Sequence, residues 1–150
     1  MVAGMVILGM APLLAGCGGP PELRAAGVTE DDLKREAEVR SLEEVAEAIE
    51  DVSDFQCGEP QGSAAGTSIK SLTCTDDEDT VEVTDYGNAT GNALNMRLMN
   101  EVYLSMGGWV ESGAAAGQNW QVTSGLSDSE HKALARELDG VIVVIGPVEG

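Results

Sequence analysis

Basic side chains, aromatic rings and histidine are all scarce in this 150-residue sequence. Eight Lys and Arg stand against 26 Asp and Glu, which gives a formal net charge of −18 at pH 7. Such an acidic excess argues against nucleic-acid binding, because cationic side chains must displace the counterions of the phosphates. It argues equally against polybasic attachment to anionic lipid. Aromatic residues make up 3% and apolar residues 43%, enough for the core of one ordinary domain.

Charged side chains are completely lacking from residues 1–16, whose apolar run from 6 to 14 is short. At about 1.5 Å per residue in a helix, such a run does not reach across the roughly 30 Å hydrocarbon core of a bilayer. Its length is typical of the apolar region of a signal peptide, which is our prediction for residues 1–16. The alternative is a buried apolar helix followed by an incidental cysteine.

The next residues carry a recognisable processing motif. Leu14-Ala15-Gly16-Cys17 resembles the lipobox of bacterial lipoproteins, in which an aliphatic residue and two small residues precede a cysteine. The resemblance implies cleavage before Cys17 and attachment of palmitate-like acyl chains to it. The protein is then expected on the extracytoplasmic face of the cell membrane, with that membrane as its partner through Cys17. Residues 18–21, Gly-Gly-Pro-Pro, suit a tether.

Two cysteines remain once Cys17 is assigned to lipid. An even number of cysteines in an exported chain favours a disulfide, here between Cys57 and Cys74. The competing interpretation is a metal or redox pair. It is weaker because the sequence has no CxxC motif and its one histidine is distant.

The mature chain predicts a stalk followed by one domain. We expect residues 17–40 to form the lipidated cysteine, the tether and a charged helical stalk, and residues 41–150 to form a single globular domain. Helices are predicted to begin at Thr29, Ser41 and Ser127, because each is followed three residues later by an acid, the pattern of a capping box. Gly140 is expected to end the last of them in a left-handed conformation.

Strands are predicted over 67–75 and 80–86, joined by the acidic turn 76–79, and over 109–111, 119–123 and 141–145. The range 113–117 is expected to be a loop. A helix over 89–105 has a broad apolar face that contains Ala93, Leu94, Leu98, Met99, Val102 and Met106. Helices and hairpins intermix, which predicts the α+β class, a small antiparallel sheet with helices packed on one face.

The mature region also loosely resembles small lipoproteins of actinobacteria. The matching features are the capped helix before Cys57, the second cysteine in a strand, the segment Gly-Gln-Asn-Trp-Gln-Val at 117–122, and the late helix that ends Leu-Asp-Gly at 138–140. That group is mostly of unassigned function, so the resemblance implies a fold and a location rather than an activity.

Candidate chemical groups all have plain structural interpretations. His131 follows Asp128 on one helical turn, where a catalytic triad cannot assemble, so we predict a solvent-facing histidine. The acidic run 76–79 attracts calcium in principle but lacks the alternating loop pattern, which favours a solvated turn. Trp109 and Trp120 are expected in the core rather than in a cleft. We therefore assign no catalytic, cofactor-binding or metal residue, and no cofactor.

Three functions follow as hypotheses. The leading one is a non-catalytic module that binds an unknown envelope protein or ligand, or otherwise interacts with the cell envelope. The alternative is a small cell-envelope hydrolase that uses acidic residues such as Glu82, Asp85 and Glu111, which a buried pair of carboxylates in one cleft would favour. The third is a solute receptor for a transporter, although 134 mature residues leave little room for the two lobes that such receptors have.

Overall fold

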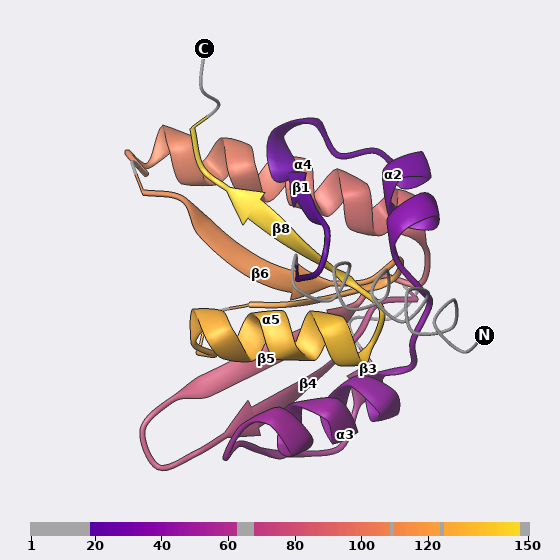
Figure 1. Ribbon diagram of the computed structural model, residues 1–150, viewed down its shortest axis with the longest axis vertical. Coiled ribbons are helices and arrows are strands. Elements are labelled where there is room, and N and C mark those ends of the chain that lie inside the picture. Colours follow the sequence, from indigo (N-terminus) through magenta and orange to yellow (C-terminus); the bar gives the residue numbers. More distant parts are fainter. Residues whose placement is uncertain (1–18, 63–67, 109, 124, 148–150) are drawn as a thin grey trace, which may run out of the picture.

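The computed structural model describes residues 19–62, 68–108, 110–123 and 125–147. Within these ranges the chain forms one mixed sheet flanked by helices (Figure 1), which confirms the predicted α+β class. The strands are β1 (Glu22–Arg24), β2 (Gln56–Cys57), β3 (Gln61–Gly62), β4 (Lys70–Thr75), β5 (Thr80–Asp85), β6 (Ser112–Ala116), β7 (Trp120–Val122) and β8 (Val141–Ile145). The helices are η1 (Ala25–Gly27), α2 (Glu30–Glu36), α3 (Leu42–Val52), α4 (Ala89–Ser105) and α5 (Asp128–Glu137).

The strands lie in the order β1-β8-β6-β7-β5-β4-β2, and β3 pairs with β4 near the edge. Every pairing is antiparallel except that of β1 with β8, which is parallel. The sheet is therefore mixed rather than purely antiparallel. The difference arises at β1, a segment that the sequence analysis places in the stalk and that instead runs beside β8.

Helices cover both faces of the sheet, not one face as predicted. Neighbouring strand residues point to opposite faces, and β8 shows this directly, because Ile142 belongs to one buried cluster while Val141 and Val143 belong to another. The first cluster lies under α3 and α5, and the second lies under η1, α2 and α4 (Figure 1). A strand that is apolar at every position is typical of a strand covered on both sides.

Residues 22–37 are part of the domain rather than a stalk. Ala25, Val28, Leu33 and Ala37 are all buried in the second cluster. A thin apolar face is sufficient here because these side chains fill the space between β8 and α4. The members of both clusters lie between Leu23 and Ile145, so a chain that starts at Gly19 contains every one of them.

The three predicted helix starts are confirmed as capping boxes. The side chains of Thr29, Ser41 and Ser127 each accept a hydrogen bond from the backbone N–H three residues on. The carboxylate of the acid at that position accepts in turn from the backbone N–H of the capping residue. The end of α5 differs from the prediction. Asp139, not Gly140, has the left-handed conformation, with φ of 53°, and Gly140 N–H donates to the carbonyl of Ala135 across 2.7 Å.

Strand β6 covers residues 113–116 of the range predicted as a loop, and it does not include the predicted strand 109–111. β6 pairs with β8 along five residues and sits inside the sheet. Its small side chains match that place, because Ala115 is buried in the first cluster and Ala116 in the second. Packing from both faces therefore overrides the weak strand propensity of glycine and alanine.

Candidate binding surface

Of the three cysteines, two lie within the described ranges. Cys57 and Cys74 form a disulfide with an S–S distance of 2.03 Å, as predicted. The two residues are direct cross-strand partners, so the disulfide joins β2 to β4 at the edge of the sheet. Cys17 and the signal-peptide range 1–16 lie outside the described residues. None of the helices in the described part has the length and apolar character that a membrane crossing needs.

His131 is buried, which corrects the predicted solvent-facing position. Its Nδ1 accepts a hydrogen bond from the backbone N–H of Ala115 across 3.1 Å. Burial lowers the pKa of the imidazole, and the negative charges of Asp128 and Glu130 oppose this in part. His131, Leu134, Ala135 and Leu138 recur at helical spacing, which places the histidine on the buried face of α5.

A small depression of about 220 Å³ lies beside His131 on the α5 face of the sheet. Glu22, Glu111 and Lys132 contribute to its wall. Glu111 is occupied by an ion pair with Arg24, at 2.6 Å, and both of these side chains are about half exposed. His131 Nδ1 accepts a hydrogen bond from the backbone of β6, and the charged side chains at the rim are solvated. The depression therefore combines a structural histidine with ordinary surface charge.

The carboxylates proposed for a hydrolase do not converge. Glu82 and Asp85 point to opposite faces of β5, because they are three positions apart and neighbouring side chains of a strand alternate between its faces. Asp85 accepts hydrogen bonds from Asn119 Nδ2, at 2.9 Å, and from Gly87 N–H, at 2.8 Å. Glu111 precedes β6, on the far side of β7 from β5. Among the described residues no Asp or Glu is fully buried.

The acidic turn and Trp120 match their structural interpretations. Asp76 Oδ1 accepts from the backbone N–H groups of Glu78 and Asp79, at 2.8 and 2.6 Å, which closes the hairpin turn. Hydrogen bonding to these groups lowers the pKa of Asp76. Trp120 is fully buried in the first cluster, so its predicted core position is confirmed. Trp109 lies outside the described residues.

Most of the apolar face predicted for α4 faces solvent, whereas Ala93, also predicted in that face, is buried. Leu98, Val102 and Met106 are 48%, 55% and 80% exposed, and they follow one another at intervals of four residues along one side of the helix. Leu94 and Leu104 are also exposed. The side of α4 that packs on the sheet is instead formed by Ala89, Asn92, Ala93, Met96 and Asn100.

Two buried asparagines hold α4 in this rotation. Asn92 Nδ2 donates to the carbonyls of Gly117 and Trp120, at 2.9 and 3.1 Å. Asn100 Oδ1 accepts from Gly146 N–H across 2.8 Å. Both bonds satisfy backbone groups at the ends of central strands, and turning the leucines inward would break them at a cost of about 1–3 kcal/mol each.

The exposed side chains line a groove of about 450 Å³, which we call the α4 groove. Its lining is almost wholly apolar and comprises Leu98, Met99, Val102, Tyr103 and Met106, together with Ile145 of β8 and with Asn95 as the polar member. The Tyr103 hydroxyl donates to the carbonyl of Val110, which ties the end of α4 to the segment before β6.

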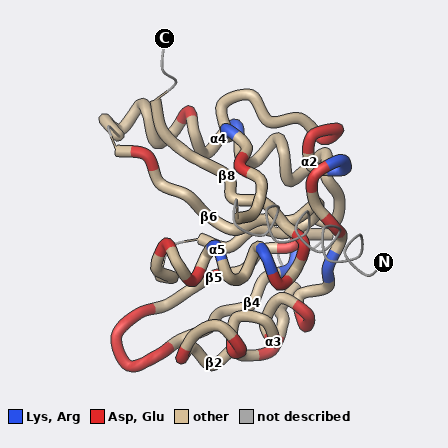
Figure 2. The backbone as a smooth tube through the Cα atoms, viewed as in Figure 1, with Lys and Arg blue, Asp and Glu red and all other residues tan. Residues whose placement is uncertain are grey.

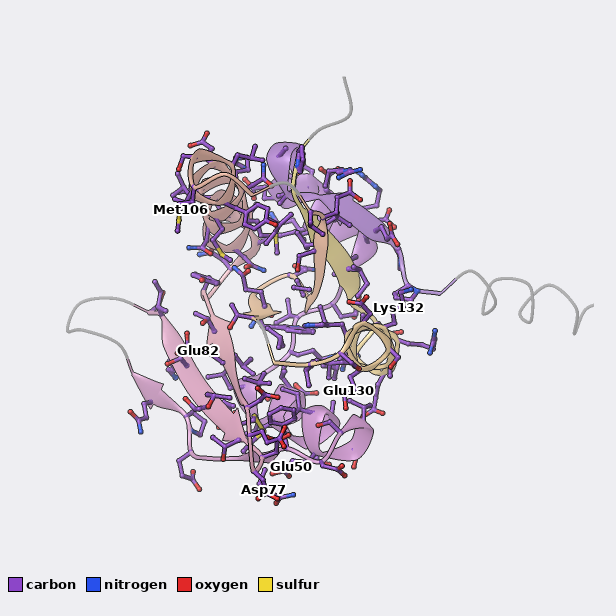
Figure 3. The ribbon with its side chains drawn as sticks, turned by 90° about the vertical axis from the view of Figure 1, so that its left-hand side faces the viewer. Glu50, Asp77, Glu82, Met106, Glu130 and Lys132 are labelled. Atoms are coloured by element: carbon purple, nitrogen blue, oxygen red, sulfur yellow. A yellow bond between two sulfur atoms is a disulfide. The ribbon has the colours of Figure 1, made fainter. Side chains whose placement is uncertain are left out.

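Beside the groove lies a sheet surface that no helix covers in the described ranges, which we call the open sheet face. By strand alternation it consists of Ser71, Thr73 and Thr75 of β4 and Thr80, Glu82 and Thr84 of β5. Gln121 of β7 points to the same side but is buried beneath α4. Figure 3 shows Glu82 on these strands and Met106 at the end of α4, both on the side away from Lys132 of α5.

A polar network joins the groove to the open sheet face. Asn95 Oδ1 accepts from Tyr86 and from Gln121 Nε2, both at 2.9 Å. Burial raises the pKa of Tyr86, and the nearby charge of Glu82 raises it further. Asn95 therefore marks the point where an apolar helix face meets a polar strand face, and the two form one continuous surface.

No protein-family model, curated protein or solved structure matches the chain. The surface must therefore be interpreted from its own chemistry. An apolar helix face next to hydroxyl and amide groups suits the docking of an amphipathic partner better than it suits bond cleavage. The sequence contained a signal for this rotation, because Asn92 and Asn100, eight residues apart, place two polar side chains on the side of α4 that packs on the sheet.

Proposed function

We propose that this protein is a lipid-anchored exported lipoprotein whose domain binds a partner in the cell envelope through the α4 groove. The observation that carries the binding function is the exposure of Leu98, Val102 and Met106 in one groove. Apolar side chains gathered in one place on a surface mark interaction sites more often than scattered ones do.

The anchor part of the proposal rests on Leu14-Ala15-Gly16-Cys17 and on the position of Gly19. A side chain at Gly19 would lie 3.9 Å from Arg136 of α5. Two residues of extended chain span only about 7 Å, so a lipid on Cys17 holds the α5 side of the domain against the bilayer. Met106 and Lys132 lie on opposite sides of the molecule (Figure 3), so the groove faces away from the membrane.

Replacement of Cys17 by serine tests the anchor. We expect Cys17→Ser to abolish acyl labelling and to give either an unprocessed precursor or a released form. The acidic domain offers no basic second anchor, so attachment depends on the lipid. A Cys17→Ser protein that is still cleaved after Gly16 and stays with membranes in high salt contradicts the lipoprotein assignment.

Photo-crosslinking in intact cells tests the binding function. A photoreactive amino acid replaces Met106 in the groove or, as the control, Val39, which is 62% exposed and lies outside it. We expect a discrete adduct with another envelope protein from position 106, lost when Val102 is also changed to Asp, and none from position 39. Equal adducts from both positions, or an adduct that survives Val102→Asp, would overturn the proposal.

A further inference from the structure

The charges around the α4 groove have one sign. Residues 98–131 and 71–96 contain no Lys or Arg, so the charged residues of β5 and of the second half of α4 are all acidic, and β6 and β7 carry no charge. Glu101 is exposed one turn from Leu98, and Glu82 is exposed on the open sheet face. Figure 2 shows the same excess of red along the β4–β5 hairpin and α3.

The nearest cations point elsewhere. Arg97, the one basic residue of α4, donates from Nη1 to the carbonyl of Val28 across 2.6 Å, on the side of the helix that packs on η1. Lys70 of β4 lies two positions from Leu72, so its side chain points to the same face as Leu72, the face covered by α3, and not to the open sheet face. Neither neutralises Glu82 or Glu101.

We propose that the occupant of the α4 groove is a basic amphipathic helix of a partner protein. This inference rests on the proposed binding function and names its partner class. The exposed side chains of Leu98, Val102 and Met106 form a stripe about 12 Å long, which a partner helix with apolar residues at i, i+3, i+4 and i+7 matches. Its Lys and Arg side chains then reach Glu101 on one side of the stripe and Glu82 on the other.

Charge also decides between this occupant and two others. A second copy of the chain would bring another −18 to the same surface, so like-charge repulsion opposes self-association. Anionic lipid is repelled for the same reason. A basic helix is the one occupant of the three whose apolar and charged parts both gain by docking.

Peptide titration with the purified domain 19–150 tests the proposal. The probes are three fluorescent 18-residue peptides: an amphipathic Leu/Lys helix, a scramble of the same composition, and a Leu/Glu helix of the same pattern. We expect the amphipathic Leu/Lys peptide to bind at least tenfold more tightly than either of the others. Val102→Asp should weaken that binding at least tenfold. Val39→Asp changes a valine that is also exposed but lies outside the groove, and it should leave the binding within twofold.

A second pair of variants separates local charge from overall charge. Glu82→Gln with Glu101→Gln should weaken the binding of the Leu/Lys peptide three- to tenfold. Asp77→Asn with Glu78→Gln removes the same charge from the distant hairpin turn and should change it less than twofold. Equal loss in both pairs means unspecific attraction to an acidic protein and overturns the proposal.

Two controls cover the other occupants, and one outcome isolates this inference from the proposed function. Light scattering that shows a dimer lost in Val102→Asp, or binding to phosphatidylcholine/phosphatidylglycerol vesicles that depends on Val102, would replace the basic helix by a second copy or by lipid. If the adduct from position 106 persists undiminished in Glu82→Gln/Glu101→Gln cells, the binding function stands and the basic partner is wrong.

Discussion

The Nδ1 atom of His131 accepts the backbone N–H of Ala115, across 3.1 Å, in the middle of the contact between α5 and β6. This hydrogen bond joins α5 to β6, a strand made only of Ser, Gly and Ala. The bond requires an unprotonated Nδ1, so this contact is sensitive to pH.

The first prediction concerns that sensitivity. The pKa of His131 is lowered by burial, so the unfolded chain, with an ordinary pKa of about 6.5, binds the proton more readily than the folded chain. Stability from this group is therefore complete above about pH 6.5 and is lost progressively as the pH falls below that value toward the lower pKa of the folded state. We expect urea unfolding to show this loss between pH 7.5 and 5.5.

The matched variants for this prediction are His131→Asn and His131→Leu. Asparagine keeps an acceptor near Nδ1 but does not titrate, so its loss of stability over the same pH range should be smaller. Leucine leaves Ala115 N–H without an acceptor and should lower stability by about 1–3 kcal/mol at pH 7.5. An unchanged pH dependence in His131→Asn would show that other groups control it.

The second prediction concerns the disulfide between Cys57 and Cys74. Both thiols should resist alkylation in the folded, unreduced protein until a reductant is added. Closing a loop of this length stabilises a fold by roughly 3 kcal/mol in the chain-entropy model, so the double Ala variant should lose about that much in urea unfolding. Reduction should destabilise the native protein by a similar amount and leave the double variant unaffected. Labelling of both cysteines without reductant would contradict the disulfide.

The third prediction concerns Gly117, in the tight turn between β6 and β7. A methyl group there would lie 2.0 Å from the indole nitrogen of Trp120, a side chain that is fully buried. Gly117→Ala should therefore cost about 1–3 kcal/mol, the usual cost of overpacking. Gly62→Ala is the control, because nothing lies within 4 Å of its added methyl group. Equal unfolding midpoints for the two variants would refute the collision.

The fourth prediction concerns the crowded carboxylates between α3 and α5. The pKa of Glu137 is raised, first by partial desolvation and then by the charge and hydrogen bonding of Asp51, with a smaller contribution from Glu47. A raised carboxyl pKa means that repulsion is present at neutral pH and is relieved as the pH falls through that pKa. Glu137→Gln should raise stability at pH 7 by a few tenths of a kcal/mol, as expected for exposed like charges.

Salt provides the check on this charge effect. The melting temperature of the native protein should rise with sodium chloride, because salt screens the self-repulsion of a chain with charge −18. The gain from Glu137→Gln should shrink in the same series, while Glu59→Gln, on an exposed loop, should give a smaller gain at low salt. A melting temperature that is flat or falls between low and moderate salt would contradict the argument.

Features encoded within a few residues could be predicted from the sequence. The capping boxes at Thr29, Ser41 and Ser127 need only a hydroxyl and an acid three residues apart. The hairpin of β4 and β5 needs only alternating apolar residues and the Asp76 turn. The disulfide followed from counting cysteines in a chain predicted to be exported. In each case the partners are neighbours or are the only ones available, so no knowledge of packing was required.

Tertiary contacts decided the rest. β1 is a strand only because β8 offers it a parallel edge, and β6 is a strand only because small side chains fit between helices on both faces. The rotation of α4 follows from Asn92 and Asn100, whose partners are backbone groups near residues 117–120 and at 146. Local periodicity counts apolar side chains, but it does not register the cost of leaving distant buried carbonyls and N–H groups unpaired. That cost turned the apolar face of α4 outward and formed the groove.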